Sequence, residues 1–598
     1  MQRIDFGKVK IGNGFWKEKQ KLISAVTVKA MYDAYSKSGH LATMSCNKNS
    51  GIKPHHFWGS DVFKWLEGIA YILKYEENTE ILKLADEVIK EIEKGVREDG
   101  YYNTYFNVTD EEIFTKCKMH ELYSLGHLIE AAVAFHGIGD DRLLKVAEKN
   151  TALVNKVFTE DKSAGFDTPG HEEIELALYK LYKCTGKNEY LELMKYFLDN
   201  RGVSEKDRKE IELEEAELHE MRTSEYTQSH LPVRRQYEAV GHAVRAVYLY
   251  SAMADMAKEE NDVELEKACN ALFDDIYGGK MYITGGIGQV PFAEEFAPKY
   301  YLPNREAYAE TCAAIGFSLF CNRMLSMKAD ARFGDVIERN MYNGFLSGIS
   351  LSGDRFFYKN PLEIDISTEA VPHIYHPESE RPMSFSCGCC PPNIVRIIPS
   401  IGNFIYGYDE KYVYIHQYIE SETEIDGEKV VVTSDYPYNG KVKVTAKRNV
   451  ALRKPSWCEE VITESEYTVK DGYMYFRDNK VEVEFVMKPK FYMAASDVHA
   501  DTGKVALTYG PFIYCAEEKD QEAKLHSLRV DPKSKIKILK SESDNLPTLS
   551  VSGEIIPTVD ELYGVYKGEK HKTVIKYIPF YTFANRGRDN MLVWINEL

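Results

Sequence analysis

Two hydrophobic patterns divide the chain near residue 405. Between about residues 16 and 400, apolar residues recur three and four positions apart, as in Val62–Leu73. This spacing is that of one face of an α-helix. After residue 405, apolar and polar residues alternate, as in Lys480–Met487, which indicates half-buried β-strands. The pattern therefore predicts a helical domain followed by an all-β region.

The helical pattern repeats in tandem with short connections. We predict helices near residues 62–73, 80–97, 120–137, 141–157, 171–185, 189–200, 236–258, 261–276, 308–329 and 332–348. So many paired helices favour a toroid of helical hairpins, an (α/α)6 barrel, over a compact bundle. The aromatic loop at 99–106 is expected to line one mouth of this barrel. The charged stretch at 200–220 is either a solvated helical insertion or a partner surface.

Turn residues separate the strands of the second half, for example Asp426-Gly427 and Asn439-Gly440. Such strands predict a β-sandwich, so the fold class is α+β multidomain. We expect the barrel at 10–405 and a first β-sandwich at 406–504. Residues 1–9 are expected to add one short strand to this sandwich, and about 588–598 another. A second β-sandwich module is predicted at 505–587.

Composition narrows the partners of the chain. The 598 residues carry a net charge of −18, which argues against nucleic acid and anionic lipid as main partners. No apolar run reaches about 18 residues, so we expect no membrane span. The N-terminus lacks the apolar segment of a signal peptide. We therefore predict a cytoplasmic enzyme; its oligomeric state, including a homodimer, stays open.

The strongest chemical signal lies at residues 385–393, Phe-Ser-Cys-Gly-Cys-Cys-Pro-Pro-Asn. Its three cysteines, Cys387, Cys389 and Cys390, precede two prolines that stiffen the backbone. A second signal, Tyr-Ala-Glu-Thr-Cys at 308–312, adds a carboxylate and a thiol. Zinc prefers four ligands of these types, and a site with four protein ligands is ordinarily structural. These residues alone do not distinguish a structural zinc site from a reactive one.

Six motifs occur in order along the chain: 61–67, 170–177, 241–246, 302–304, 308–312 and 387–393. Together they resemble glycoside hydrolase family 127, the β-L-arabinofuranosidases, over about residues 1–590. The resemblance implies an (α/α)6 barrel followed by β-sandwich modules, a zinc ion, and a retaining mechanism with a cysteine nucleophile. It further implies release of terminal non-reducing β-L-arabinofuranose from small oligosaccharides.

Site residues follow from the same resemblance. Cys389 matches the nucleophile, and Glu294 matches the general acid/base. The zinc ligands match Glu310, Cys312, Cys389 and Cys390, whereas Cys387 lies outside the metal shell. The sugar-contacting positions match His120, His171, His242 and Tyr358. Glu295 competes with Glu294, which is preferred because the family places its acid two positions before an aromatic residue, here Phe296.

The expected chemistry requires a raised pKa at Glu294, for which Phe292 and Phe296 would supply apolar surroundings. Some of these residues also fit purely structural roles. The three histidines would each fit a hydrogen-bonded core role, and Asp61 with Lys64 would fit an ion pair on a helix surface. Two other functions stay open: a different hydrolase or lyase on the same barrel with a structural zinc, and a carbohydrate-binding protein without catalysis.

Overall fold

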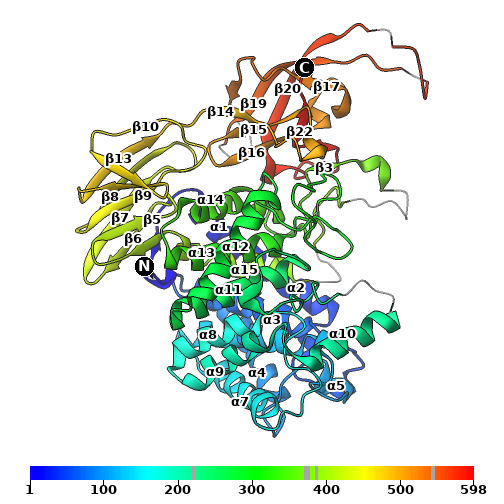
Figure 1. The fold of residues 1–598 in the computed structure, drawn as a ribbon, viewed down its shortest axis with the longest axis vertical. Helices are drawn as coiled ribbons and strands as arrows, with labels where there is room; N and C mark the ends of the chain where they lie inside the picture. Colours follow the sequence, from blue (N-terminus) through cyan, green and yellow to red (C-terminus); the bar gives the residue numbers. More distant parts are fainter. Residues whose placement is uncertain (219–222, 370–376, 384–387, 541–545, 560, 567) are drawn as a thin grey trace.

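The computed structural model describes residues 1–598 except 219–222, 370–376, 384–387, 541–545, 560 and 567; the side chains of 213–218 are also outside the description. Cys387 therefore lies outside the described residues. The helices occupy one end of the molecule, and two β regions lie beside and beyond them (Figure 1). Among the described residues, no helix is both long and apolar enough to cross a membrane.

Six inner helices form a closed ring in which each contacts the next and the last contacts the first. They are α3 (Trp58–Leu73), α6 (Glu121–His136), α8 (Ile174–Thr185), α11 (Ala243–Glu260), α13 (Thr311–Met327) and α15 (Cys390–Ile397). Most of their residues are buried, as expected for helices covered on all sides. This ring confirms the predicted (α/α)6 barrel.

The outer helices are amphipathic because only one side faces the ring. In α4 the buried residues Ile81, Ala85, Val88, Ile89 and Ile92 follow helical spacing. The outer set is α2 (Val28–Ser38), α4 (Thr79–Gly95), α7 (Arg142–Asn155), α9 (Asn188–Asn200), α12 (Val263–Gly279) and α14 (Ala331–Arg339). Three further helices are α1 (Phe15–Leu22), α5 (Phe106–Thr109) and α10 (Glu205–Leu218), the last within the charged stretch.

Two six-stranded sheets form the first β region, and their alternating buried residues share one core cluster. The first has the order β1 (Gln2–Arg3), β4 (Tyr406–Tyr408), β5 (Tyr412–Ile415), β9 (Asn449–Arg453), β12 (Tyr473–Phe476) and β11 (Tyr467–Lys470). The second has the order β10 (Val461–Ile462), β13 (Lys480–Phe485), β8 (Lys441–Thr445), β7 (Glu428–Ser434), β6 (Ser421–Ile425) and β2 (Lys10–Ile11). The N-terminus thus supplies two short strands, one to each sheet, where one was predicted.

The C-terminal β region is a single connected network of ten strands. Its main order is β14 (Pro489–Tyr492), β15 (Lys504–Tyr509), β16 (Phe512–Glu517), β20 (His571–Pro579), β19 (Thr548–Ile555) and β17 (Leu528–Val530). The others are β3 (Glu363–Ile364), β18 (Lys537–Leu539), β21 (Met591–Leu592) and β22 (Trp594–Asn596).

Two expectations about this region were wrong. The last strand, β22, pairs with β15 and does not return to the first sandwich. β14 also pairs with β15, so 489–492 belong to the C-terminal region and not to the first sandwich. Both errors arise because alternation identifies a strand but not its partner. We propose domain limits at 405 and 488.

Buried ion pairs hold the first β region to the barrel. Arg453 of β9 is fully buried and pairs with Asp335 and Glu338 of α14, the latter at 2.6 Å.

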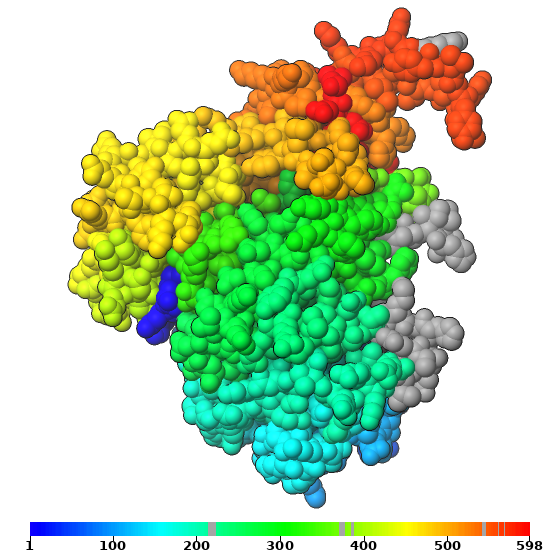
Figure 2. Space-filling view, viewed as in Figure 1, coloured from blue at the N-terminus to red at the C-terminus, as the bar shows by residue number. Residues whose placement is uncertain are grey.

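Figure 2 shows the first β region against the side of the helical domain, and the hairpin between β19 and β20 projecting as an arm. The described apolar residues of the arm, such as Leu562 and Tyr563, are largely exposed.

Candidate active site

The N-termini of the six inner helices gather at one mouth of the barrel, because the outer helices carry the chain back after each inner one. His120 and His242 are the N-caps of α6 and α11, and His171 lies three residues before α8. Glu310 and Cys389 are the N-caps of α13 and α15. The sequence prediction began α8, α11 and α13 too early, at 171, 236 and 308, because periodicity does not mark where the first helical turn begins.

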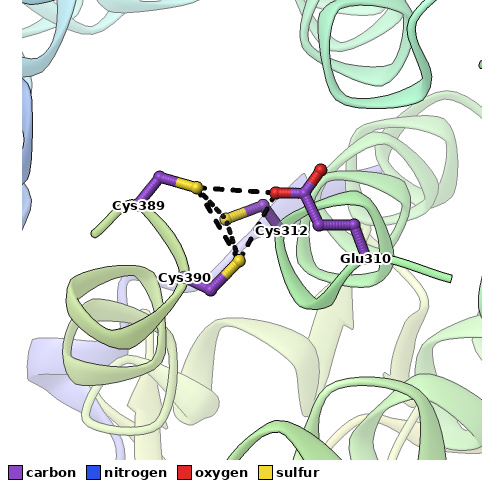
Figure 3. A group of neighbouring side chains, drawn as sticks. All are labelled: Glu310, Cys312, Cys389 and Cys390. Atoms are coloured by element: carbon purple, nitrogen blue, oxygen red, sulfur yellow. Dashed lines mark hydrogen bonds between the residues drawn. The ribbon is translucent and has the colours of Figure 1, made fainter. Parts of the chain in front are cut away.

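Glu310, Cys312, Cys389 and Cys390 come together at this mouth, with their ligand atoms all within 4.8 Å of one another. In Figure 3 the sulfur atoms of the three cysteines and one oxygen of Glu310 face a common centre. The sulfur of Cys312 lies 3.3 Å from that of Cys390 and 3.7 Å from that of Cys389. Oε1 of Glu310 lies 3.5 Å from the Cys389 sulfur and 3.4 Å from the Cys390 sulfur.

These distances fit a tetrahedral metal site. Zinc–sulfur bonds of about 2.3 Å and a zinc–oxygen bond of about 2.0 Å give ligand–ligand edges of about 3.5–3.8 Å. Four of the observed separations, at 3.4–3.7 Å, lie close to these edges, and the Cys312–Cys390 sulfur separation is shorter, at 3.3 Å. Three thiols and a carboxylate are also the donor types that bind zinc. The helix N-termini at Cys389 and Glu310 add partial positive charge, which stabilises anionic ligands.

A cavity of about 390 Å³ opens above this cluster. It is lined by the predicted residues Cys389, Cys312, Glu310, Glu294, His120, His171, His242 and Tyr358. Cys390 is fully buried beneath the cavity, whereas Cys389 is partly exposed to it. The expectation for the loop at 99–106 was wrong, because Tyr101–Phe106 are buried and do not line this cavity.

Three of the predicted sugar contacts form one wall. The ring centroids of His120 and His171 are 5.5 Å apart, and those of His171 and His242 are 5.6 Å apart. Burial and neighbouring positive charge lower the pKa of His171 far below its usual value, so its ring is neutral. On another element, the backbone carbonyl of Tyr358 accepts a hydrogen bond from Thr311 at 2.9 Å, which holds Tyr358 beside Glu310.

His242 fixes the position of Glu294. Its Nδ1 accepts backbone N–H groups of Val244 and Arg245 at 3.2 and 3.5 Å, so the proton lies on Nε2. Nε2 donates to Oε2 of Glu294 at 2.6 Å. Burial lowers the pKa of His242, so the ring is a neutral donor to the carboxylate.

The expected raised pKa at Glu294 was wrong for this state of the protein. Burial would raise the pKa, but the His242 N–H, the nearby Tyr308 hydroxyl and the Arg245 charge offset it, so the pKa lies below the usual value. Phe296 is buried as expected, but Phe292 is 85% exposed and supplies no apolar cover. Glu294 has a φ of +60°, in the left-handed region that non-glycine residues seldom adopt.

Glu295 differs from Glu294 both in its pKa and in its position relative to the cavity. Burial and the nearby Glu225 carboxylate raise its pKa to about 7, yet its side chain does not line the cavity. Its backbone instead forms bridges with His242 and Val290. Because an acid must reach the substrate before its pKa matters, the geometry favours Glu294.

Residues 8–403 match the family model of the β-L-arabinofuranosidase GH127 catalytic domain, and 489–596 match the family's C-terminal domain. The chain belongs to glycoside hydrolase family 127. The predicted resemblance is thereby confirmed, and the chain is a glycoside hydrolase.

Relatives of the family 127 chain agree with this assignment. It is 34% identical over 509 residues to a protein of Bifidobacterium longum described as a non-reducing end β-L-arabinofuranosidase, covering 79% of this chain and 77% of the relative. A solved β-L-arabinofuranosidase from Geobacillus stearothermophilus T6 superimposes with a TM-score of 0.93, at 35% identity over 99% of this chain and 100% of the other. Another solved β-arabinofuranosidase of family 127 superimposes with a TM-score of 0.89. It is 30% identical to this chain, and the match covers 100% of this chain and 98% of the other.

Several residues of the family 127 cavity were not predicted as site residues. Asp61 and Tyr123 line it, and Lys64 donates to the Tyr123 hydroxyl at 3.1 Å and lies 3.4 Å from Asp61. The expected surface ion pair of Asp61 and Lys64 was wrong, since both side chains are at most 1% exposed. The sequence carried no clear signal for their burial, because Asp61, Lys64 and Glu67 recur at steps of three and share one face of α3, as on a solvent-exposed helix.

Proposed function

We propose that this enzyme hydrolyses terminal non-reducing β-L-arabinofuranosides of small oligosaccharides with retention of configuration. One observation carries the proposal: the Cys389 sulfur belongs to a four-residue metal cluster yet faces a cavity that also contains Glu294. A purely structural cluster has no need of such access. The family membership and the named relatives support the sugar assignment.

The proposed metal is zinc, held by Glu310, Cys312, Cys389 and Cys390. Bound zinc would keep the sulfurs deprotonated at neutral pH, where a free thiol with a pKa of about 8.5 is mostly protonated. The three buried ligands would hold the ion while Cys389, the exposed member, meets the substrate. The partial exposure of Cys389 to the cavity and the burial of Glu310, Cys312 and Cys390 support this division of roles.

In the first half-reaction, the Cys389 sulfur attacks the anomeric carbon while the bond from that carbon to the leaving oxygen breaks. The fraction of enzyme in which the Glu294 carboxyl is protonated is the reactive one, and in it Glu294 donates that proton to the leaving oxygen. In the second half-reaction, Glu294 takes a proton from water, the water oxygen attacks the anomeric carbon, and the carbon–sulfur bond breaks. The Glu294 side chain is one-third exposed, which allows water to reach it in the second step.

The cavity walls would bind the sugar. His120, His171, His242 and Tyr358 offer ring nitrogens and a hydroxyl to the hydroxyl groups of one furanose unit. The cavity volume of about 390 Å³ lies near the lower end of ligand sites, about 300–1,000 Å³. A site of this size suits a single terminal sugar and favours release from a chain end.

A panel of nitrophenyl glycosides tests the proposal, with the metal content of the same samples measured by mass spectrometry. We expect turnover of the β-L-arabinofuranoside, about one zinc per chain, and first release of the β-anomer by NMR. First release of the α-anomer would contradict the double displacement. Zinc without turnover of any glycoside would favour a carbohydrate-binding protein.

Replacing His242 with Asn should shift the pH profile of kcat/KM. Asn can still cap α11, but it is too short to donate to Glu294. The pKa of Glu294, now held low, should rise, so the carboxyl keeps the proton it must donate up to a higher pH. The alkaline limb of kcat/KM, which reports the free enzyme, should therefore move to higher pH.

The matched control is His171→Asn, because His171 makes no described hydrogen bond to Glu294. This control should lower kcat/KM while leaving the alkaline limb in place. An unchanged limb in His242→Asn, or one moved to lower pH, would contradict the role of His242 as the donor that stabilises the Glu294 carboxylate.

A further inference from the structure

A second cluster of residues of the types that bind metals lies behind the cavity. His127, Glu130 and Glu173 bring their ligand atoms within 4.8 Å of one another, and all three are buried. Two cations already occupy this place, since Lys180 and Arg396 both pair with Glu130. Arg396 also pairs with Glu67 at 2.9 Å. Glu130 therefore receives two protein cations, and the ion pairs of Arg396 are the feature of this group that bears on the metal cluster.

Arg396 belongs to the helix that carries the metal ligands. Cys390 is the first residue of α15, and Asn393 and Arg396 follow at steps of three, on the same side of that helix. Nε of Arg396 donates to Oδ1 of Asn393 at 2.6 Å. The side of α15 that bears Cys390 is thus also the side that holds the guanidinium.

Tyr248 of α11 joins this side of α15 to a helix two steps away in the ring. Its hydroxyl oxygen accepts from Nη2 of Arg396 at 3.0 Å and from Nδ2 of Asn393 at 3.2 Å. Tyr248 is 1% exposed and Asn393 is fully buried, so water cannot replace these bonds easily. Buried hydrogen bonds of this kind are costly to break, since each group left unpaired keeps its desolvation penalty.

We propose that Tyr248, with Asn393 and Arg396, is a positioning element that fixes α15 so that Cys389 and Cys390 meet Glu310 and Cys312 at metal-binding distance. The buried ion pairs of Arg396 with Glu67 and Glu130 tie α15 to α3 and α6, and Tyr248 ties it to α11. A small shift of α15 would widen the sulfur–sulfur and sulfur–oxygen distances of the cluster. This inference rests on the metal site of the proposed function.

The test compares Tyr248→Phe with Tyr250→Phe in the full-length, cobalt-loaded protein. Tyr250 lies two residues along the same helix and is equally buried, and its hydroxyl has no hydrogen-bond partner among the described residues. Both variants lose one hydroxyl from one helix, but only Tyr248→Phe frees the side of α15 that bears the ligands. Two signals are recorded: the thiolate-to-cobalt charge-transfer absorption, and the rate of cobalt release to EDTA.

Tyr248→Phe should release cobalt about fivefold to a hundredfold faster than wild type, the factor expected for two buried hydrogen bonds, and its charge-transfer band should weaken. Tyr250→Phe should match wild type in both signals. Arg396→Lys, which keeps the charge but not the directed donors, should release cobalt at least as fast as Tyr248→Phe.

Equal cobalt release and equal bands in Tyr248→Phe and Tyr250→Phe, with a normal wild-type band, would overturn the inference and leave the metal site standing. A wild-type protein with no charge-transfer band would overturn the metal site itself and this inference with it. The melting temperature of each variant distinguishes loss of folding from loss of metal, and a folded Tyr248→Phe that binds cobalt as wild type does would likewise overturn the proposal.

Discussion

Replacing Cys389 with alanine should lower kcat/KM for a β-L-arabinofuranoside on the order of 10⁴-fold or more, which is the usual effect of removing an enzyme nucleophile. The sulfur is the one cluster ligand whose side chain is open enough for attack, because Cys390 is sealed beneath the cavity and Cys312 is 2% exposed. Steady-state kinetics with a nitrophenyl substrate measures the loss. Metal content measured on the same sample shows whether zinc is retained.

Cys321→Ala is the matched control for this substitution. Cys321 is a fully buried cysteine of α13, nine residues after Cys312, and it is outside the metal cluster. Its loss creates a small cavity and costs stability, but it should change kcat/KM less than about tenfold. If Cys389→Ala kept turnover while retaining its metal, the cluster would be structural and the reacting group would lie elsewhere.

Replacing Glu294 with Gln should lower turnover about 10²- to 10⁴-fold for substrates whose leaving group needs a proton, the usual contribution of general acid catalysis. For a dinitrophenyl leaving group, which departs without protonation, the first half-reaction should be nearly unchanged. The second half-reaction still needs a base to activate water. The variant should therefore give a burst of dinitrophenolate followed by slow turnover, which stopped-flow absorbance measures.

Glu295→Gln separates the two adjacent carboxylates. Its raised pKa alone would make Glu295 the better acid, so pKa and geometry give opposite predictions for this pair. Because Glu294 lines the cavity and Glu295 does not, Glu295→Gln should keep turnover within about tenfold of wild type and show no burst. A burst in Glu295→Gln and none in Glu294→Gln would reverse the assignment.

Much of the architecture could be predicted from the sequence because it depends on periodicity. The apolar spacing of 62–73 predicts a helix, and the number of such helices in tandem predicts the ring. The alternation in 480–485 requires a half-buried strand. The cluster at 387–390 and the motif at 308–312 indicate metal-ligand chemistry because few other functions gather several thiols and a carboxylate.

Other features could not be predicted because they depend on contacts between distant segments. The hydrogen bond from His242 to Glu294 joins residues 52 positions apart and reverses the expected direction of the Glu294 pKa. Burial of Asp61 with Lys64 depends on the ring closing around α3. The pairing of β22 with β15 depends on which strand edge is free in the C-terminal sheet network, and alternation carries no such information.

A glycosyl group trapped on Cys389 would test the central claim most directly. Glu294→Gln should accumulate the covalent intermediate with dinitrophenyl β-L-arabinofuranoside, because its formation needs no proton donor and its breakdown needs a base. After acid quenching, peptide mass spectrometry should find one anhydropentose on the peptide that contains Cys389, and none in the Glu294→Gln, Cys389→Ala double variant. A sugar attached to a carboxylate, or turnover without any adduct on Cys389, would contradict this account.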